Sequence, residues 1–395
     1  MQTTPNSNRL QIGLFGVRNA GKSSLLNAVV NENTATVSDI PGTTTDPVRR
    51  AMELPNIGAT LFIDTAGIDD EGELGKLRVE KTLEAAKRVD IALLFFDENN
   101  FDAIIKFLPN LKSAKTVAVI NKIDELKDKG ESIRKKIKQA AKLPVVSVSA
   151  KTREGIDDLL KEILRAMPED FESVSITGNL VTAGDVVMLV MPEDSGAPKG
   201  RLILPQVQTI RELLDKGAIP MCTVVEKIPE ALKSLKNPPK LVITDSQAFK
   251  RVYELTPKDT PLTSFSILFG NYKGDIDFFV KSAKKMLELK KDASILIAEA
   301  CAHRPLEEDI GRVKIPKLLR KKLGDDIKIE FTNGADFPKD LSPYDLIIHC
   351  GACMFNRRYV LKRIEEAKSQ NTPMTNYGVA IAALLGILDN VVYPN

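Results

Sequence analysis

The sequence predicts an α/β protein of three domains, in which a small α/β domain lies between two domains built on parallel sheets. Short apolar runs that suit buried strands alternate with amphipathic runs that suit helices along all 395 residues. Polar motifs follow several apolar runs directly, as ligand-binding residues do at the carboxyl edge of an open sheet. The strand pattern restarts after the polar stretch MPEDFES. We therefore place the domains at residues 1–172, 173–270 and 271–395.

Composition narrows the classes of partner. The chain has 56 Lys and Arg against 53 Asp and Glu, so no strong field points to a nucleic-acid partner. The longest apolar run, residues 379–388, is about half of what a bilayer span needs, so we expect a buried helix and no membrane. The N-terminus lacks the pattern of a secretory signal, and four cysteines then suggest a reducing, cytoplasmic location.

The first domain begins with a phosphate-binding motif. The apolar run 9–16 leads into GVRNAGKSS, which matches G-x-x-x-x-G-K-[ST] between a strand and a helix. Backbone N–H groups of such a loop wrap phosphates, and the helix N-terminus adds a favourable dipole. Lys22 would reach the β- and γ-phosphates, and the Ser23 hydroxyl would bind Mg²⁺. The predicted nucleotide contacts in this loop are Gly16, Asn19, Ala20, Gly21, Lys22, Ser23 and Ser24.

Three further motifs complete a GTP site. LFIDTAG supplies Asp64 for Mg²⁺ and Gly67, whose N–H can meet the γ-phosphate. In TVAVINKID, the Asp124 carboxylate can accept both N1–H and N2–H₂ of guanine, a donor pair that adenine lacks. VVSVSAK ends in a loop that can cover the base. The predicted base contacts are Asn121, Lys122, Asp124, Ser149, Ala150 and Lys151. Residues 8–170 thus resemble a Ras-like P-loop GTPase domain of the translation-factor class.

This resemblance assigns the catalytic machinery. It implies that Thr44, in PGTTTDP, closes on Mg²⁺ and the γ-phosphate, beside Lys22 and Gly67. Ile68 stands where Ras-like enzymes carry a water-orienting glutamine, so hydrolysis should be slow or need another device. A carboxylate of the second switch could contribute, or this stretch could be a solvated loop. The sequence does not choose among Asp69, Asp70, Glu71 and Glu73.

Asn19 suggests how this GTPase could compensate for the absence of the water-orienting glutamine. The string NAGKSS is similar to that of the potassium-activated GTPases related to the tRNA-modifying GTPase MnmE. In those enzymes the asparagine helps hold K⁺ against the phosphates, where an arginine finger would otherwise lie. The resemblance therefore implies Asn19 as a K⁺ ligand, whereas the plain alternative is a turn residue.

The middle domain, residues 173–270, shows apolar strands and no residues of a chemical site. Small α/β units of this kind often serve assembly, but nothing in these residues shows dimerisation directly. Cys222 lies between apolar residues and far from the other cysteines, so we expect its thiol in the core.

Both histidines and three of the four cysteines fall in two short patches, CAHRP and HCGAC. Each patch ends an apolar run, so parallel pairing would bring both to one sheet edge. Such a cluster favours metal binding, although buried packing residues or a redox C-x-x-C pair are alternatives. Cys301, Cys350 and Cys353 with either His303 or His349 would suit zinc. Three thiolates with an open position would equally suit a [4Fe–4S] cluster.

The C-x-H and H-C-x-x-C motifs behind a GTPase domain resemble HydF, the [FeFe]-hydrogenase maturation GTPase family. LFGNYKGD, LIAEACAH and EEDIGRVKIP are also similar to the third domain of that family. The resemblance implies a middle dimerisation domain and a C-terminal α/β domain that binds [4Fe–4S] through Cys301, Cys350 and Cys353. His303 or His349 is then a possible fourth ligand, and at least one of the two is not a ligand.

The same resemblance implies a scaffold that carries a diiron precursor. The precursor would be made with two radical-SAM maturases and delivered to apo-[FeFe]-hydrogenase. One competing function is a potassium-activated GTPase of tRNA modification or ribosome assembly, against which the absence of a basic C-terminal RNA module counts. The other is a zinc metallochaperone that uses GTP to gate ion transfer.

Overall fold

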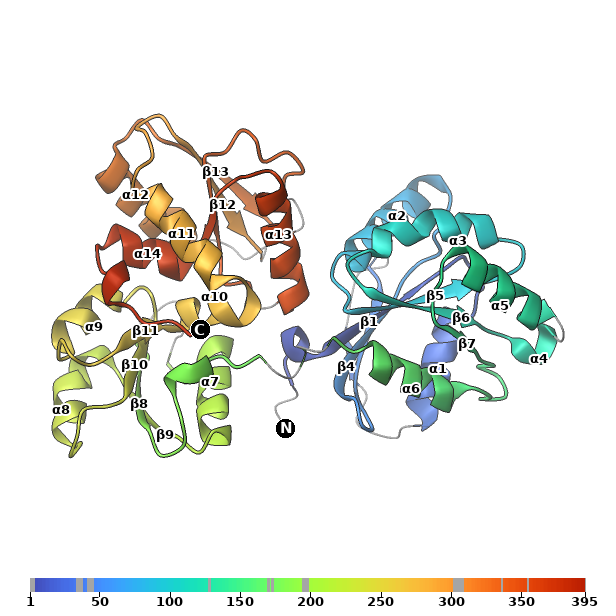
Figure 1. Cartoon of the computed structure of the whole chain (residues 1–395), viewed down its shortest axis with the longest axis horizontal. Coiled ribbons are helices and arrows are strands. Elements are labelled where there is room, and N and C mark those ends of the chain that lie inside the picture. Colours follow the sequence, from blue (N-terminus) through green and yellow to red (C-terminus); the bar gives the residue numbers. More distant parts are fainter. Residues whose placement is uncertain are drawn as a thin grey trace. The chain divides into compact units, whose positions relative to one another are not determined.

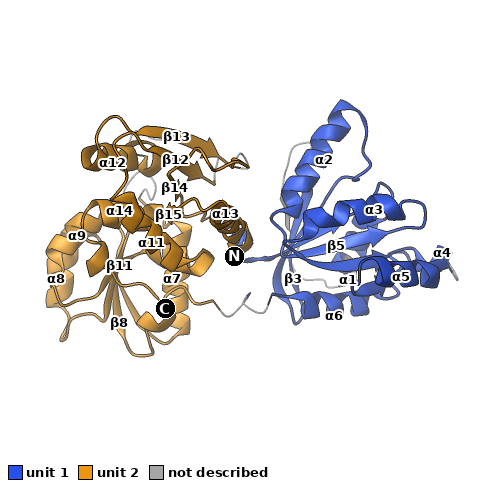
Figure 2. Ribbon diagram, turned by 45° about the horizontal axis from the view of Figure 1, so that its top comes forward, with its two compact units in different colours: residues 1–173 blue, residues 174–395 orange. Residues whose placement is uncertain are grey.

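The computed structural model describes residues 4–32, 38–40, 46–126, 129–168, 171, 174–193, 199–300, 309–334, 337–353 and 355–394. The chain divides into two compact units, Met1–Ser173 and Val174–Asn395, which are coloured blue and orange in Figure 2. The first unit contains one sheet and the second contains two, all predominantly parallel. The predicted α/β class is confirmed.

The first unit is built on a seven-stranded sheet with the order β2-β3-β4-β1-β5-β6-β7. Only the β2–β3 and β3–β4 pairs are antiparallel. β1 and β5 are buried along their whole length, which explains their continuous apolar sequences. The strands are β1 (Leu10–Phe15), β2 (Ser38–Ile40), β3 (Val48–Leu54), β4 (Gly58–Asp64), β5 (Ile91–Phe96), β6 (Lys115–Ile120) and β7 (Val145–Ser147).

Helices flank this sheet in Figure 1. They are α1 (Lys22–Glu32), α2 (Gly72–Ala86), α3 (Phe101–Phe107), α4 (Ile123–Leu126), α5 (Lys129–Ala140) and α6 (Ile156–Ala166). Parallel strands end at one edge of the sheet, so the loops that follow β1, β4, β6 and β7 come together there. These are the loops that carry the four predicted nucleotide motifs.

The second unit contains two four-stranded sheets, with the orders β11-β10-β8-β9 and β13-β12-β14-β15. Every strand pair in both sheets is parallel. The strands of the first are β8 (Val186–Val190), β9 (Ile219–Thr223), β10 (Leu241–Thr244) and β11 (Leu262–Ser264). Those of the second are β12 (Ser294–Glu299), β13 (Lys328–Asn333), β14 (Leu346–His349) and β15 (Met374–Asn376).

One hydrophobic core spans both sheets of the second unit. Met188 of β8 and Val242 of β10 belong to the same buried cluster as Ile295 and Ile297 of β12. The helices of this unit are α7 (Leu204–Asp215), α8 (Ile228–Lys233), α9 (Phe249–Leu255), α10 (Phe265–Lys273), α11 (Ile276–Met286), α12 (Ile315–Leu323), α13 (Arg357–Ser369) and α14 (Tyr377–Leu384). Because α10 contacts both α7 and α14, the expected boundary at residues 270 and 271 lies inside a helix that packs on both halves.

The apolar run 379–388 forms most of the buried helix α14, as predicted. Of the helices described here, none is long and apolar enough to cross a membrane. Cys222 differs from expectation, because it is exposed on β9 rather than buried in the core. β9 is the edge strand of its sheet, and apolar sequence neighbours do not distinguish an edge strand from a central one.

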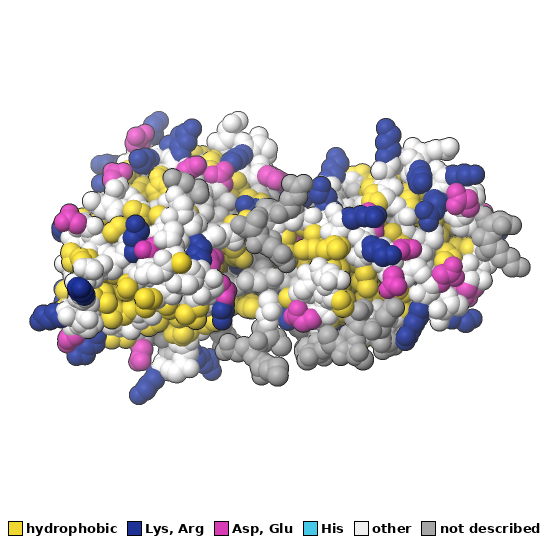
Figure 3. All heavy atoms as spheres, turned by 60° about the horizontal axis from the view of Figure 1, so that its bottom comes forward, with side chains coloured by type: hydrophobic (Ala, Val, Ile, Leu, Met, Phe, Trp, Pro, Cys, Tyr) yellow, Lys and Arg dark blue, Asp and Glu magenta, His cyan; other side chains and the backbone are white. Residues whose placement is uncertain are grey.

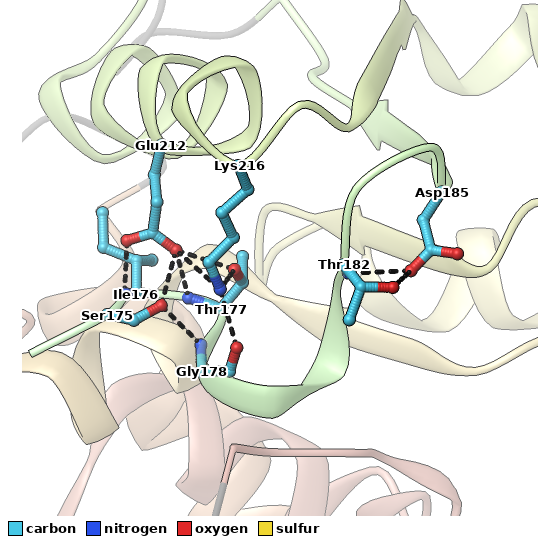
Figure 4. A network of polar contacts seen from close by, with 8 residues as sticks. All are labelled: Ser175, Ile176, Thr177, Gly178, Thr182, Asp185, Glu212 and Lys216. Atoms are coloured by element: carbon cyan, nitrogen blue, oxygen red, sulfur yellow. Dashed lines mark hydrogen bonds and ion pairs between the residues drawn. The ribbon is translucent and has the colours of Figure 1, made fainter.

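A carboxylate anchors the beginning of the second unit to α7 (Figure 4). The Glu212 carboxylate accepts hydrogen bonds from Ser175 Oγ at 2.9 Å, from Ile176 N at 2.5 Å, and from Thr177 N and Oγ1 at 2.8 and 2.7 Å. Lys216, which directly follows α7, donates from its Nζ to Thr177 Oγ1 at 2.8 Å. The segment that leaves the first unit is thus tied to the second within its first few residues.

Candidate functional site

The phosphate-binding loop joins β1 to α1 and holds its lysine inward. Lys22 is buried, and its Nζ donates to the carbonyls of Gly16 at 3.1 Å and Val17 at 2.8 Å. Burial lowers the pKa of Lys22, while the nearby carboxylates, Asp64 foremost, oppose that shift. The ammonium therefore lies inside the loop, where phosphate oxygens can replace the carbonyls as its partners.

Asn121 joins three of the predicted motifs. Its Nδ2 donates to the carbonyls of Ala20 and Gly21, both at 3.2 Å. Its Oδ1 accepts from the N–H of Lys122 at 2.8 Å and from that of Ala150 at 3.2 Å. Gly21 has a φ of +84°, and a Cβ there would lie 2.2 Å from Asn121 Nδ2, so only glycine fits. The phosphate loop and the two base-binding loops are thus fixed to one another.

The base-binding residues are positioned by hydrogen bonds among themselves. Ser149 Oγ donates to Asp124 Oδ1 at 2.7 Å and accepts the N–H of Thr152 at 3.1 Å. Lys122 Nζ donates to the carbonyl of Asn19 at 2.9 Å. This arrangement fixes one edge of the Asp124 carboxylate, which the recognition of two guanine donors requires. Lys151 is exposed in the same loop.

Ser23 and Asp64 form the candidate magnesium site. Ser23 Oγ donates to Asp64 Oδ2 at 2.5 Å. Within the described residues, Asp64 Oδ1 is buried without a hydrogen-bond partner. Burial raises the pKa of Asp64, and the hydrogen bond from Ser23 opposes that shift. An unsatisfied carboxylate oxygen beside a hydroxyl is a donor set that suits Mg²⁺. Thr44, the other predicted ligand, lies outside the described residues.

The second switch lies against the phosphate loop. The N–H of Ile68 donates to the carbonyl of Gly16 at 3.1 Å, and Asp69 Oδ1 accepts the N–H of Arg18 at 2.7 Å. Asp70 forms ion pairs with Arg18 at 3.6 Å and Arg78 at 3.9 Å. These contacts separate Asp69 and Asp70 from the other two acidic candidates, Glu71 and Glu73, which are exposed.

A cavity of about 270 Å³ opens beside this switch. Its walls include Asp64, Gly67 and Asp70 together with two arginines, Arg18 and Arg78. Sequence reasoning missed both arginines, although a basic residue inside the phosphate motif is a visible signal for Arg18. The predicted catalytic residue Gly67 is buried and lines a charged cavity next to the phosphate loop.

The cysteine patch follows β14, next to the end of β12. The two strands pair in parallel, with Ala298 opposite His349. The N–H of Cys350 donates to the carbonyl of Ala298 at 2.9 Å, and the N–H of Ala300 donates to Cys350 Sγ at 3.1 Å. The residue before Cys301 thus contacts the first cysteine of the C-x-x-C pair.

Part of the predicted metal site lies beyond the described chain. Cys301 and His303 fall outside the described residues, and Cys353 follows Cys350 on a partly exposed turn. Within the described residues, no group of three or more metal-binding side chains occurs. Burial raises the pKa of the Cys350 thiol, and the N–H groups of Ala300 and Ala352 oppose that shift.

His349 is buried with partners on both ring nitrogens. Its Nε2 lies 2.9 Å from Arg363 Nη1, and its Nδ1 lies 2.6 Å from the carbonyl of Cys350. A guanidinium can only donate, so Nε2 accepts and the proton is on Nδ1. Burial and the Arg363 charge lower the pKa of His349 to about 3. As arranged here, His349 holds the loop and has no free nitrogen for a metal.

Comparison with known proteins assigns the family. The "Hydrogen maturase F dimerization domain" matches residues 176–274, and the "Hydrogen maturase F tetramerization domain" matches residues 277–394. The chain belongs to the HydF family. A third domain family, described as "50S ribosome-binding GTPase", matches residues 11–122 of this HydF protein. The first unit is therefore a GTPase domain, and the second unit carries the domains through which this family oligomerises.

Individual relatives are GTPases that match part of this chain. A GTPase Der of Sulfurihydrogenibium is 36% identical over 184 residues, which cover 43% of this chain and 41% of Der. A tRNA modification GTPase MnmE of Pseudothermotoga lettingae is 32% identical over 253 residues, which cover 60% of this chain and 50% of MnmE. The aligned parts thus span half or less of these two relatives. The cytosolic domain of the FeoB iron transporter of T. maritima, solved in apo form, is 24% identical with a TM-score of 0.32, over 40% of this chain and 63% of that one.

Proposed function

We propose that this HydF protein is a GTP-hydrolysing scaffold that binds a [4Fe–4S] cluster and delivers a diiron precursor to [FeFe]-hydrogenase. The contact from the N–H of Ala300 to Cys350 Sγ, at 3.1 Å, carries the proposal. It brings the segment that leads into Cys301 against the C-x-x-C turn. Three thiols on two adjacent strand ends would then converge, although their sequence positions are about 50 residues apart.

The donor chemistry of this edge fits such a cluster. Cys350, Cys353 and Cys301 would hold it as thiolates, and His349 would keep the turn in place through its bond to the Cys350 carbonyl. A cluster held by three thiolates supplies an iron with an exchangeable position, which suits a carrier. His303 is the remaining histidine candidate for a fourth ligand.

GTP hydrolysis would depend on residues of the first unit alone. Lys22 would bind the β- and γ-phosphates, Ser23 and Asp64 would hold Mg²⁺ with Thr44, and the N–H of Gly67 would meet the γ-phosphate. Ile68 packs partly buried against the hydrophobic core and has no polar group that could orient water. We therefore propose slow intrinsic hydrolysis.

Potassium would supply the positive charge that an arginine finger would otherwise place against the phosphates. Asn19 is exposed on the phosphate loop in a left-handed conformation with a φ of 58°, so its side chain is accessible at the nucleotide surface. Hydrolysis should be faster in KCl than in NaCl at equal ionic strength, and Asn19→Ala should remove the difference. Equal rates of the wild type in both salts would exclude this role.

Assembly would use the second unit. Hydrophobic side chains gather on one face of this unit in Figure 3. Leu214 of α7 and Ile219 of the edge strand β9 are exposed, and so is Cys222. An apolar edge strand of this kind favours pairing with a second copy. We propose a homodimer formed by residues 173–270, a GTPase domain at 1–172 and a cluster domain at 271–395.

We propose that the protein acts in the cytoplasm. Its partners there would be radical-SAM maturases and apo-[FeFe]-hydrogenase. The charge of the chain is nearly balanced, so it lacks the excess of positive charge that favours nucleic-acid binding.

Metal analysis tests the proposal directly. The protein is purified without oxygen, reconstituted with iron and sulfide, and assayed for iron, sulfide and zinc. We expect about four irons and four sulfides per chain, lost when Cys301, Cys350 and Cys353 are all changed to serine, with GTP hydrolysis nearly unchanged. One zinc per chain, with no chromophore after reconstitution, would instead support a zinc carrier. A loss of GTP hydrolysis in the triple variant would contradict the separation of the two sites.

A further inference from the structure

A buried lysine contacts the C-x-x-C turn. Lys273, the last residue of α10, is only 2% exposed. Its Nζ donates to the carbonyls of Ala352 at 3.1 Å, Cys353 at 3.1 Å and Phe355 at 2.7 Å. The three donors of the ammonium thus match three backbone oxygens within four consecutive residues.

The turn that Lys273 contacts is in an unfavourable conformation. Ala352, between the two cysteines, has a φ of +45°. A non-glycine residue in this left-handed region costs free energy and persists only where the surroundings impose it. The carbonyl of Ala352 is one of the three that Lys273 holds, so the ammonium is placed to impose this conformation.

The contact also joins two regions of the second unit. Lys273 lies in the segment matched by the dimerization domain, and the turn lies in the segment matched by the tetramerization domain. Phe355, which accepts the shortest of the three bonds, stacks on Tyr359 of α13 with ring centroids 4.4 Å apart. The ammonium therefore fixes the turn from one side while α13 holds it from the other.

We propose that Lys273 is a positioning residue for the cluster, which holds Cys350 and Cys353 in their ligating arrangement before the cluster arrives. This inference rests on the proposed function. Charge-assisted bonds to backbone oxygens offset the cost of burying the ammonium, and what they secure is the shape of the turn.

The test measures how firmly the reconstituted full-length protein holds its cluster. Lys273→Met keeps the length and the apolar stem of the side chain and removes its donors. We expect this variant to lose its chromophore to an excess of iron chelator about ten- to a hundredfold faster than wild type. After one-electron reduction, the electron paramagnetic resonance signal of its cluster should be broader than that of wild type, and GTP hydrolysis should be unchanged. Lys216→Met is the matched control, because Lys216 also donates to a backbone carbonyl, that of Gly178, away from the cysteine turn.

A second substitution separates positioning from general stability. Glycine adopts positive φ without strain, so adding Ala352→Gly to Lys273→Met should restore most of the cluster retention. If Lys273 only stabilises the fold, the melting temperature of the apo-protein falls and the glycine restores nothing. That result, or a wild-type rate of loss in Lys273→Met, would overturn the inference.

Two further outcomes concern a variant that does not fold and a wild-type protein that takes up no cluster. If Lys273→Met does not fold, Lys273→Gln, which keeps two donors, should show an intermediate rate, and a wild-type rate would overturn the inference. If wild-type protein takes up no cluster on reconstitution, the proposed function itself fails.

Discussion

The hydroxyl of Ser23, at the start of α1, donates to the carboxylate of Asp64, at the end of β4, at 2.5 Å. The phosphate loop connects α1 to β1, and β1 is paired with β4, so the two side chains meet at the carboxyl edge of the sheet. With Asp64 Oδ1, which has no hydrogen-bond partner among the described residues, they present three oxygens at one point. Removal of the Ser23 oxygen should therefore weaken the binding of Mg²⁺.

Ser23→Ala should reduce GTP hydrolysis by about a hundredfold or more, because Mg²⁺ loses a protein ligand and its charge stabilisation of the phosphates. The measurement is the rate of phosphate release across a range of Mg²⁺ concentrations, in which the variant should need more metal. Ser234→Ala, at an exposed serine outside the GTPase domain, serves as the control. A variant with the wild-type Mg²⁺ dependence would place the metal elsewhere.

Asp124→Asn should shift preference from GTP toward xanthosine triphosphate. The amide presents a donor where guanine also donates, whereas xanthine offers a carbonyl at that position. Competition for a fluorescent nucleotide measures the two affinities in the same experiment. Ser149→Ala should weaken both nucleotides, since it frees the Asp124 carboxylate without changing its chemistry. An unchanged preference in Asp124→Asn would mean that the base binds another loop.

Glu212→Gln should destabilise the second unit by about 2 kcal/mol, because the amide replaces one acceptor oxygen by a group that donates toward other donors. Calorimetry of the full chain measures this effect. GTP raises the transition of the first unit, so the transition that does not respond to GTP belongs to the second. Glu230→Gln, at an exposed ion pair with Lys227, should change little. Equal effects of the two substitutions would remove the anchoring role of Glu212.

Asp275 should make the second unit less stable in acid. Burial opposes its ionisation, but hydrogen bonds from Lys368 at 2.6 Å and from the N–H of Phe278 at 2.9 Å outweigh it, so the pKa of Asp275 is below its usual value. The unfolded chain therefore binds more protons at pH values below about 4, and this contribution to stability, complete above that pH, is lost as the pH falls.

Two substitutions at Asp275 separate charge from capping. Asp275→Asn keeps an acceptor for the first turn of α11 and should cost a few tenths of a kcal/mol at pH 7. Asp275→Ala also removes the cap and should cost about 1 kcal/mol. Urea unfolding at several pH values measures both. The difference between wild type and Asp275→Asn should shrink below about pH 4, and a difference independent of pH would contradict the assignment.

The nucleotide motifs could be predicted because each is a short run of residues whose chemistry and strand context are both visible in sequence. Asn121 illustrates this, since its motif implies a base-binding loop and the structure adds the bonds to Ala20 and Gly21. Cys222 was predicted wrongly because apolar neighbours do not reveal which strand lies at an edge. The sequence did not distinguish among the four candidate carboxylates of the second switch. Contacts with Arg18 in the structure favour Asp69 and Asp70.

In the C-terminal domain, the sequence indicates the thiols but not the side chains that hold the cysteine turn in place. Lys273 and the carbonyl of Cys353 are 80 residues apart, and nothing in the string NYKGD marks a buried cation. Arg363 occupies an amphipathic helix pattern in which an arginine is ordinarily solvent-facing, yet it is 3% exposed and bonded to His349. Long-range polar contacts of this kind depend on tertiary packing, which local patterns do not encode.

The core shared by the two sheets of the second unit bears on how such a protein can change during evolution. Segments that fold around separate cores can be exchanged between genes, whereas here a cut between residues 274 and 277 would divide one apolar interior. The two segments must therefore be inherited together and change in step. The GTPase domain has a core of its own and is under no such constraint.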